Sequence, residues 1–297
     1  MKILLTGATG FLGSHIAESL CEIGFDLLVT RRNSSLLDKC ITFTKSVQWV
    51  NTDDDKWIER AIDFKPNIII HAAWNGIENN KRDELQTQLS NIDFLYQLLK
   101  IAKESDTKKF ISLGSQAEYG QFNEKVTEEY KVNPVGYYAV VKLACLEYLK
   151  SFCIYNNIEW YWLRVFSVIG KNDNSGCLVP MVIDKLKKNE AIDLTLGNQC
   201  YDYMYVNDFC NSLLKVINST KNNSGVYNVC SGKPTKIKDL LVTIAAKLNK
   251  SLELLKFGVL PYRPNQTMFM VGDSDKFDAT FGYCNTTTME DMVAKLI

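Results

Sequence analysis

The chain has 297 residues, which is enough to bury a large core and is long for one small domain. Lys plus Arg and Asp plus Glu balance at 34 each, and no basic block appears, so nucleic acid and membrane surfaces are not expected partners. Nine cysteines lie in apolar stretches without a C-x-x-C pair, which predicts reduced thiols in a cytoplasmic protein and no metal site. The sequence shows neither a signal peptide nor an apolar run of membrane-spanning length, in agreement with that expectation.

Strands and helices alternate through the first half of the chain. We expect strands at residues 3–6, 26–30, 46–50, 68–71, 110–113 and 160–165. Helical patterns fall between them, at residues 13–23, 56–64, 84–105 and 136–156. This order predicts an α/β fold whose doubly wound parallel sheet is covered by helices on both faces.

The alternation loosens after residue 166. A loop rich in Gly and Asn at 170–176 precedes a helix expected at 180–188, and segments rich in Tyr and Cys follow. We therefore predict a main domain at residues 1–166 and a smaller C-terminal α/β lobe at 167–297, with some later segments returning to the main sheet.

Three glycines occupy the turn between the first expected strand and the first expected helix. Gly7 permits a tight turn, Gly10 leaves backbone N–H groups open to a pyrophosphate, and Gly13 allows close helix packing. The positive end of the helix then faces the anion. An ordinary glycine turn requires neither flanking element, so we favour the dinucleotide site of a Rossmann-type domain. The cofactor contacts expected here are Gly7, Thr9, Gly10, Phe11, Leu12 and Gly13.

The sequence contains two Y-x-x-x-K patterns. One joins Tyr138 to Lys142 and comes after an expected strand that leads to Ser115. The other joins Tyr96 to Lys100 inside an apolar helical pattern, where we expect core packing. Context therefore selects Ser115, Tyr138 and Lys142 as the catalytic candidates.

The G-x-x-G-x-x-G spacing and this Ser, Tyr and Lys set resemble the short-chain dehydrogenase/reductase superfamily. Further matches carry a resemblance to its extended branch, the NAD-dependent epimerase/dehydratase family, and they lie at residues 71–73, 91, 164–170, 202–208 and 226–229. The resemblance covers almost the whole chain. It implies that residues 1–166 bind the dinucleotide, with contacts from Ala73, Asn91 and Phe166, and that residues 167–297 mainly bind substrate.

Three residues of these segments have competing interpretations. We expect His71 to be a structural histidine, not a catalyst, and Asp208 to be a helix cap, not an acid. Phe166 belongs either to the core or to a wall beside the nicotinamide. We favour the wall.

The chemistry of the catalytic candidates follows from proton balance. Moving a hydride between a nicotinamide and a sugar carbon requires a proton at the sugar oxygen, and a phenol serves well when its pKa falls toward neutrality. Lys142 lies one helical turn after Tyr138, where its ammonium is expected to stabilise the phenolate. Ser115 is expected to orient the same sugar oxygen. By resemblance, Tyr138 and Lys142 also contact the cofactor.

Departures from the family pattern narrow the reaction. Dehydratases of the family carry an Asp-Glu pair directly after the hydroxyl residue, whereas this chain has Gln116 and Ala117, which disfavours dehydration. Epimerases use an acidic residue at the end of the second strand to hold the adenosine ribose, whereas this chain has Arg31 and Arg32. Two guanidinium groups suit a 2′-phosphate and favour NADPH over NAD, although a solvated strand end is the alternative.

The substrate contacts implied by the resemblance are partly present. They are Ser115, Gln116, Ser167, Tyr203 and Arg263. Tyr201 stands where the family has a second diphosphate-binding arginine, so Arg263 alone is expected to bind the pyrophosphate of a nucleotide sugar.

These features predict an NADPH-dependent reductase of a nucleotide-linked 4-keto-6-deoxyhexose, as in deoxysugar and O-antigen biosynthesis. The alternatives are an NAD-dependent nucleotide-sugar 4-epimerase and, in another class, a non-catalytic NADP(H)-sensing protein. Retention of all three catalytic candidates argues against a mere binder. By resemblance, the expected assembly is a homodimer through the helices at 84–105 and 136–156.

Overall fold

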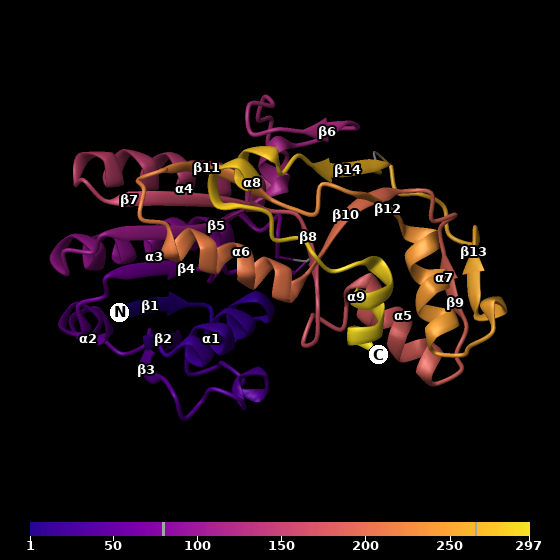
Figure 1. Cartoon of the computed structure of the whole chain (residues 1–297), viewed down its shortest axis with the longest axis horizontal. Helices are drawn as coiled ribbons and strands as arrows, with labels where there is room; N and C mark the ends of the chain where they lie inside the picture. Colours follow the sequence, from indigo (N-terminus) through magenta and orange to yellow (C-terminus); the bar gives the residue numbers. More distant parts are fainter. Residues whose placement is uncertain (79–80, 265) are drawn as a thin grey trace. The chain divides into compact units, whose positions relative to one another are not determined.

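The computed structural model describes residues 1–78, 81–264 and 266–297, and their contacts divide the chain into two compact units. The first unit comprises residues 1–120, 131–165 and 213–227. The second comprises residues 121–130, 166–212 and 228–297. Figure 1 labels the helices and strands of both.

The first unit is built on a seven-stranded sheet. Its strands are β1 (Lys2–Thr6), β2 (Asp26–Arg31), β3 (Gln48–Asn51), β4 (Ile68–His71), β5 (Lys109–Ser115), β7 (Glu159–Val165) and β11 (Gly225–Val229). Their spatial order is β11-β7-β5-β4-β1-β2-β3, and the strands from β7 to β3 run parallel. Because the order reverses between β1 and β4, the carboxyl ends of these two strands flank a topological switch point.

Four helices follow strands of this sheet, as the alternation predicts. They are α1 (Phe11–Ile23), α2 (Trp57–Phe64), α3 (Leu85–Glu104) and α4 (Gly136–Tyr155). All residues of β4 are buried, which is typical of a parallel strand covered on both faces. The predicted doubly wound α/β fold is therefore confirmed.

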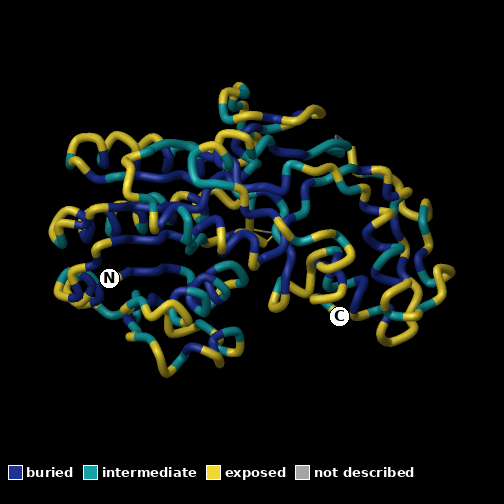
Figure 2. Tube along the Cα trace, viewed as in Figure 1, coloured by how far each residue is buried: buried dark blue, intermediate teal, exposed yellow. Residues whose placement is uncertain are grey.

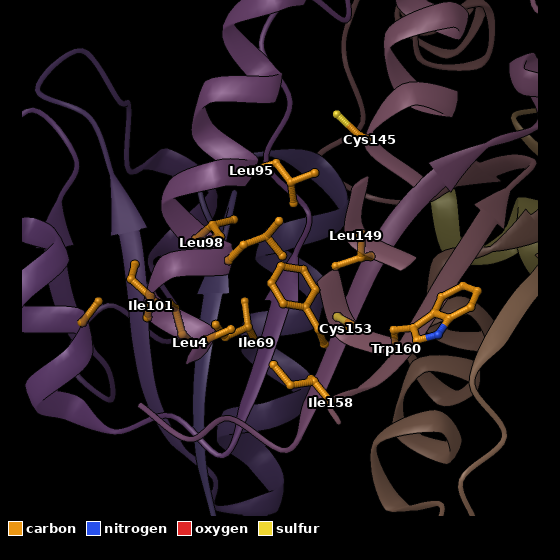
Figure 3. Close-up of a cluster of buried hydrophobic side chains, with 14 of the residues drawn as sticks. Leu4, Ile69, Leu95, Leu98, Ile101, Cys145, Leu149, Cys153, Ile158 and Trp160 are labelled. Atoms are coloured by element: carbon orange, nitrogen blue, oxygen red, sulfur yellow. The ribbon is translucent and has the colours of Figure 1, made fainter. Parts of the chain in front are cut away.

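A hydrophobic cluster joins α2, α3 and α4 to the sheet. Figure 3 shows Leu98 of α3 and Leu149 of α4 beside Ile69 of β4, and all three side chains are buried. The tube in Figure 2 marks the central strands as buried. Such a core holds the strand ends rigidly, so loops and side chains at those ends are placed accurately.

The second unit has a mixed sheet and helices. Its main sheet has the order β12-β10-β14-β6, β8 pairs with β10, and β13 pairs with β9. The strands are β6 (Lys125–Val126), β8 (Ser167–Ile169), β9 (Ile192–Leu194), β10 (Cys200–Tyr205), β12 (Pro234–Lys236), β13 (Leu255–Phe257) and β14 (Phe269–Gly272). The helices are α5 (Leu178–Lys187), α7 (Ile237–Lys247), α8 (Asp275–Phe281) and α9 (Met289–Leu296). One further helix, α6 (Val206–Asn218), has residues in both units.

Candidate active site

The glycine turn after β1 is tightly packed. Gly7 has a φ of +80°, and a β-carbon there would lie 2.6 Å from the backbone nitrogen of Ala73. A β-carbon at Gly13 would lie 2.0 Å from the carbonyl oxygen of Gly7. Both positions therefore require glycine, for the reasons that the sequence predicts. The turn lies at the switch point between β1 and β4.

The amino end of α1 is suited to an anion. Its N-cap is Gly10, which has no side chain to cap the first turn, and no acidic residue lies in that turn. The first backbone N–H groups of a helix have no partner within the helix, and they attract phosphate. Phe11 and Leu12 are half-buried beside this end. The turn thus fits the pyrophosphate of a dinucleotide.

Arg31 and Arg32 lie at the end of β2, exposed to solvent. The guanidinium carbon of Arg31 lies 5.8 Å from the ring centroid of Trp49. The backbone N–H of Arg32 donates to the Ser35 hydroxyl at 2.9 Å. Both side chains are placed where the adenosine ribose binds in a doubly wound domain. Their contact with a 2′-phosphate stays a prediction.

Ser115 is held at the end of β5 by a capping box. Its hydroxyl oxygen accepts from the backbone N–H of Ala117 at 3.2 Å, while its own N–H donates to the Glu118 carboxylate at 2.8 Å. These bonds fix the short helical turn Gln116–Tyr119. The hydroxyl of Ser115 is therefore set in one place at the switch-point edge of the sheet.

Glu118 anchors this turn from inside. Its carboxylate accepts from the Arg164 guanidinium at 2.8 Å and from the Trp162 indole N–H at 2.9 Å, and all three side chains are buried. A β-carbon at Gly114 would lie 2.1 Å from the indole nitrogen, so the indole also depends on that glycine. Glu118 is thus a structural anion whose oxygens are already committed. Glu118 is not among the predicted site residues, and the S-x-x-E pattern of residues 115–118, the signature of a capping box, is the signal in the sequence for its role.

The three predicted catalytic residues come together in the first unit. The Ser115 hydroxyl hydrogen-bonds Tyr138. The Lys142 ammonium lies 5.9 Å from the Tyr138 ring centroid and donates to the carbonyl oxygen of Leu113 at 2.7 Å. Burial lowers the pKa of Lys142 to about 7. Near neutrality this side chain is able both to give and to accept a proton.

The expected lowering of the Tyr138 pKa is not what the structure shows. Burial has the largest effect and raises the pKa of Tyr138, and the charge of Glu118 adds to it. The hydrogen bond with Ser115 and the positive charge of Arg82 act in the opposite direction. The expectation rested on the charge of Lys142, which would lower the phenol pKa. It left out the desolvation of the buried phenol, which raises that pKa.

Two neighbours of Tyr138, Arg82 and Trp74, are not among the predicted site residues. The guanidinium carbon of Arg82 lies 4.1 Å from the Tyr138 ring centroid. Trp74 meets the same ring edge-on at 5.8 Å, and the Lys142 ammonium lies 3.6 Å from the Trp74 centroid. Both residues belong to the segment between β4 and α3. The signal for them in the sequence is their position after β4, because ligands bind at the carboxyl ends of the strands that flank a switch point.

Asn91 and Ala73 hold that segment in place. The Asn91 amide accepts from the backbone N–H of Asn75 at 2.7 Å and donates to the Asn75 carbonyl at 3.1 Å. The N–H of Ala73 donates to the Thr6 hydroxyl at 3.2 Å. These bonds explain both residues as supports of the segment. Their direct contact with a cofactor stays a prediction.

The expectations for His71 and Asp208 can be compared with the structure. His71 is a buried structural histidine, as expected: its Nδ1 lies 2.9 Å from the Thr6 hydroxyl, and burial lowers its pKa to about 3. The assignment of Asp208 as a helix cap is wrong, because α6 begins at Val206 and the Asp208 carboxylate accepts from the N–H of Thr287 at 2.9 Å.

The expectation that Tyr96 packs in the core is also wrong. Its side chain is 69% exposed, whereas its neighbours Leu95, Leu98 and Leu99 on α3 are buried. Tyr96 lies about 100° around the helix from Leu95, so the two face different directions. The apolar pattern included a residue of the outer face.

The remaining predicted substrate contacts are distributed over both units. Gln116 is half-buried in the turn after Ser115, in the first unit. In the second unit, Ser167 of β8 lies beside Tyr203 of β10 in a parallel pair. Phe166 is buried against Gly272, whose β-carbon would lie 2.7 Å from its ring, so core packing accounts for it. Its contact with a nicotinamide stays a prediction.

Arg263 is exposed in the second unit, and its charge interacts with Tyr201. Burial raises the pKa of Tyr201, while a hydrogen bond from Gln266 and the charge of Arg263 oppose that change. The Tyr201 hydroxyl accepts from the Gln266 amide at 2.6 Å and donates to the Thr267 carbonyl at 3.0 Å. Tyr201 therefore holds Gln266 and Thr267, and the backbone N–H of Gln266 donates to the carbonyl oxygen of Arg263 at 3.1 Å.

The described residues contain no group of three His, Cys, Asp or Glu side chains that would hold a metal ion. Among the helices of residues 1–78, 81–264 and 266–297, none is long and apolar enough to cross a membrane.

Known proteins resemble this chain over nearly its full length. CDP-abequose synthase of Salmonella muenchen is 27% identical over 302 residues, which cover 100% of this chain and 97% of that protein. A putative UDP-glucose 4-epimerase of Methanocaldococcus jannaschii is 30% identical over 80% of this chain and 79% of its own length. The crystal structure of UDP-glucose 4-epimerase from Thermotoga maritima has a TM-score of 0.89 at 21% identity, covering 99% of this chain and 97% of that one.

The family assignment rests on most of the chain. Residues 3–230, from the first strand to the end of β11, match the model of the NAD dependent epimerase/dehydratase family. This stretch includes the glycine turn and the assembled Ser115, Tyr138 and Lys142. The chain therefore belongs to the NAD-dependent epimerase/dehydratase family and is a nucleotide-sugar enzyme of the extended short-chain dehydrogenase/reductase type.

Proposed function

We propose that the protein is an NADPH-dependent reductase of the C4 keto group of a nucleotide-linked 4-keto-6-deoxyhexose. The observation that carries the proposal is the assembly of Ser115, Tyr138 and Lys142 next to a turn whose one carboxylate, Glu118, is bound to Arg164. This set has a proton donor for the sugar oxygen, and the turn has no free carboxylate to remove a proton from carbon. Net reduction needs only the proton donor.

Each residue has a defined part in this reaction. NADPH, when bound, supplies the hydride that adds to the keto carbon. The Tyr138 phenol gives its proton to the sugar oxygen, so that the C=O double bond becomes an alcohol. The Ser115 hydroxyl positions that oxygen, and Lys142, with a pKa of about 7, returns a proton to the phenolate.

The cofactor is assigned to the first unit. The glycine turn and the amino end of α1 would hold the pyrophosphate, and Arg31 and Arg32 would hold the 2′-phosphate of NADPH. In the first unit, Ser115 and Gln116 would contact the sugar. Ser167, Tyr203 and Arg263, in the second unit, stay predicted substrate contacts. Support comes from the relative named CDP-abequose synthase, which aligns over the whole chain.

A 4-epimerase that uses NAD is the second candidate. The 30% identity to a putative UDP-glucose 4-epimerase favours it, because that is a higher identity than the one to the synthase. The two reactions share the same acid and the same glycine turn. They differ in whether the cofactor is consumed.

We further propose that two copies of the chain associate through α3 and α4. Both helices carry large apolar side chains that are exposed to solvent, among them Leu85, Leu89 and Tyr96 on α3 and Val140 and Tyr148 on α4. An apolar face of this kind on a water-soluble enzyme marks an interaction surface. Two long helices from each subunit suffice for a four-helix contact.

The test uses a panel of 4-keto-6-deoxyhexoses linked to dTDP and to CDP, each offered with NADPH and with NADH. We expect stoichiometric loss of NADPH absorbance with at least one of them. Tyr138→Phe should lower turnover about a hundredfold or more, because the phenol hydroxyl delivers the proton, while cofactor affinity stays nearly unchanged. Tyr137→Phe is the matched control, since this neighbouring tyrosine is exposed and faces another direction. Protein that purifies with tightly held NAD and interconverts two sugar nucleotides without net absorbance change would establish the epimerase instead.

A further inference from the structure

Arg82 stacks on the phenol ring of the proposed acid. Its guanidinium carbon lies 4.1 Å from the Tyr138 ring centroid, within the range at which a cation and an aromatic face attract each other. Arg82 is half-buried, so its charge is less screened by water than that of a surface arginine. Neither the glycine turn nor the Y-x-x-x-K pattern includes it.

The segment that carries Arg82 is tied to α3. The buried amide of Gln88 donates to the carbonyl oxygens of Gly76 at 2.8 Å and Lys81 at 3.1 Å, and accepts from the Trp74 indole at 2.9 Å. The N–H of Arg82 itself donates to the Glu78 carbonyl at 3.0 Å. One buried side chain therefore positions both neighbours of the Tyr138 ring.

Charged groups approach Tyr138 from each element packed around it. Lys142 lies on α4, at 5.9 Å from the ring centroid. Glu118 lies in the turn after β5, and its charge is paired with Arg164. The Asp83 carboxylate lies near Gly136, two residues before Tyr138, where a β-carbon would be 2.5 Å from it.

Arg82 differs from these groups in that its charge is permanent. The pKa of Lys142 is lowered by burial to about 7, so this amine is partly neutral at physiological pH and is lost as a cation above it. A guanidinium remains charged at every pH at which the protein is folded. Arg82 is also the arginine whose charge acts to lower the pKa of Tyr138, against burial.

We propose that Arg82 is a positioning residue whose fixed positive charge sets the acidity of Tyr138, leaving Lys142 to move protons. The proposal rests on the proposed function, in which Tyr138 is the proton donor. The charge that acts on the phenol then comes from Arg82, between β4 and α3. The proton transfer comes from Lys142, on α4.

The first experiment titrates Tyr138 directly and needs no turnover. Phenolate absorbance near 295 nm is followed against pH for the wild type and for Tyr138→Phe, and the difference between them isolates this one tyrosine. The same difference is taken in an Arg82→Gln background. We expect the midpoint to rise by about one pH unit in that background, because loss of a nearby cation destabilises the phenolate. Arg82→Lys puts an amine in place of the guanidinium, and an ordinary lysine amine loses part of its charge at the alkaline pH of this titration, so its midpoint should lie between those of the wild type and Arg82→Gln.

The matched control is Lys81→Gln, which removes an exposed positive charge one residue away. It should leave the midpoint within about 0.2 pH units, since surface charges are screened. An unchanged midpoint in Arg82→Gln overturns the proposal, and so does an equal rise in Lys81→Gln. If Arg82→Gln folds poorly, Arg82→Met against the wild type, at pH values where both are folded, gives the same comparison.

The second experiment follows the pH dependence of reduction. A proton donor must be protonated, so turnover falls as pH rises through its pKa. In Arg82→Gln this alkaline limb should move upward together with the spectroscopic midpoint, and the plateau should fall because a weaker acid transfers its proton more slowly. A shifted titration without reduction of any keto sugar would support the role of Arg82 and contradict the proposed function. If reduction depends on Tyr138 but the alkaline limb lies at the same pH in Arg82→Gln as in the wild type, the result would support the proposed function and contradict the role of Arg82.

Discussion

Two residues at the end of β2, Arg31 and Arg32, carry the prediction of cofactor preference. If Arg31 and Arg32 hold a 2′-phosphate, replacing both with serine removes charge-assisted hydrogen bonds that only NADPH makes. We expect the double variant to bind NADPH more weakly by about 1.5–3 kcal/mol, with NADH binding nearly unaffected. Titration of cofactor fluorescence measures both affinities. The control is Lys45→Ser, which removes an exposed cation elsewhere on the same unit.

An equal loss of affinity for NADPH and for NADH would contradict this assignment. It would mean that the two arginines contact the shared part of the dinucleotide or support the loop after β2. The backbone contacts of that loop, such as Asn33 N–H to the Asp53 carboxylate at 2.8 Å, do not use the two arginine side chains.

The sequence predicts the chemistry-bearing residues better than their surroundings. Gly7 and Gly13 show the close contacts expected of them, and Ser115, Tyr138 and Lys142 come together, because local motifs at strand ends specify these positions. The sign of the Tyr138 pKa change and the approach of Trp74 and Arg82 were missed. Those depend on how a long segment folds over the phenol, which no local spacing encodes.

At the scale of elements, one buried lysine terminates a helix. Lys109, the first residue of β5, donates to the carbonyl oxygens of Val216 at 3.0 Å, Ile217 at 3.1 Å and Ser219 at 3.0 Å, at the end of α6. The last carbonyls of a helix lack the i+4 N–H donors of its interior, and a cation there also complements the helix dipole. Lys109→Met should therefore lower the free energy of unfolding by about 2–4 kcal/mol, measured by urea denaturation.

The neighbouring Lys108 offers a control for this prediction. Its ammonium lies 2.5 Å from Asp106 on the exposed surface. Lys108→Met should change the free energy of unfolding by less than about 0.5 kcal/mol, because exposed ion pairs contribute little. Equal effects of the two substitutions would show that the carbonyl contacts of Lys109 are unimportant.

Elements of the first unit follow the predicted ranges within a few residues. Strand β4 falls at Ile68–His71, as expected, and α3 and α4 are each one or two residues shorter than the periodicity suggests. In the second unit only α5 was anticipated. Its strands are short, as in β8 with three residues, and they pair with segments far along the chain, so alternation has no length in which to appear.

For the whole molecule, the exposed face of α3 and α4 predicts assembly. The protein should scatter light as a dimer at micromolar concentration, with α3 and α4 of both copies in an isologous contact. Tyr96 and Tyr148 are 69% and 58% exposed, so the double variant Tyr96→Glu, Tyr148→Glu would place charges in that contact and should be monomeric. Ile41→Glu changes an exposed apolar residue outside these helices and should remain dimeric. A wild type that is monomeric throughout this range would contradict the assembly.

The turn after β5 also bears on how new activities arise. Its geometry is specified by Ser115 and Glu118, whose side chains bond to the backbone on either side, whereas Gln116 and Ala117 between them contribute only backbone. Natural variation is thus free to exchange the two middle side chains while the outer two preserve the loop. We therefore expect a scaffold of this kind to carry or to lack the carboxylates needed for elimination while the loop keeps its shape.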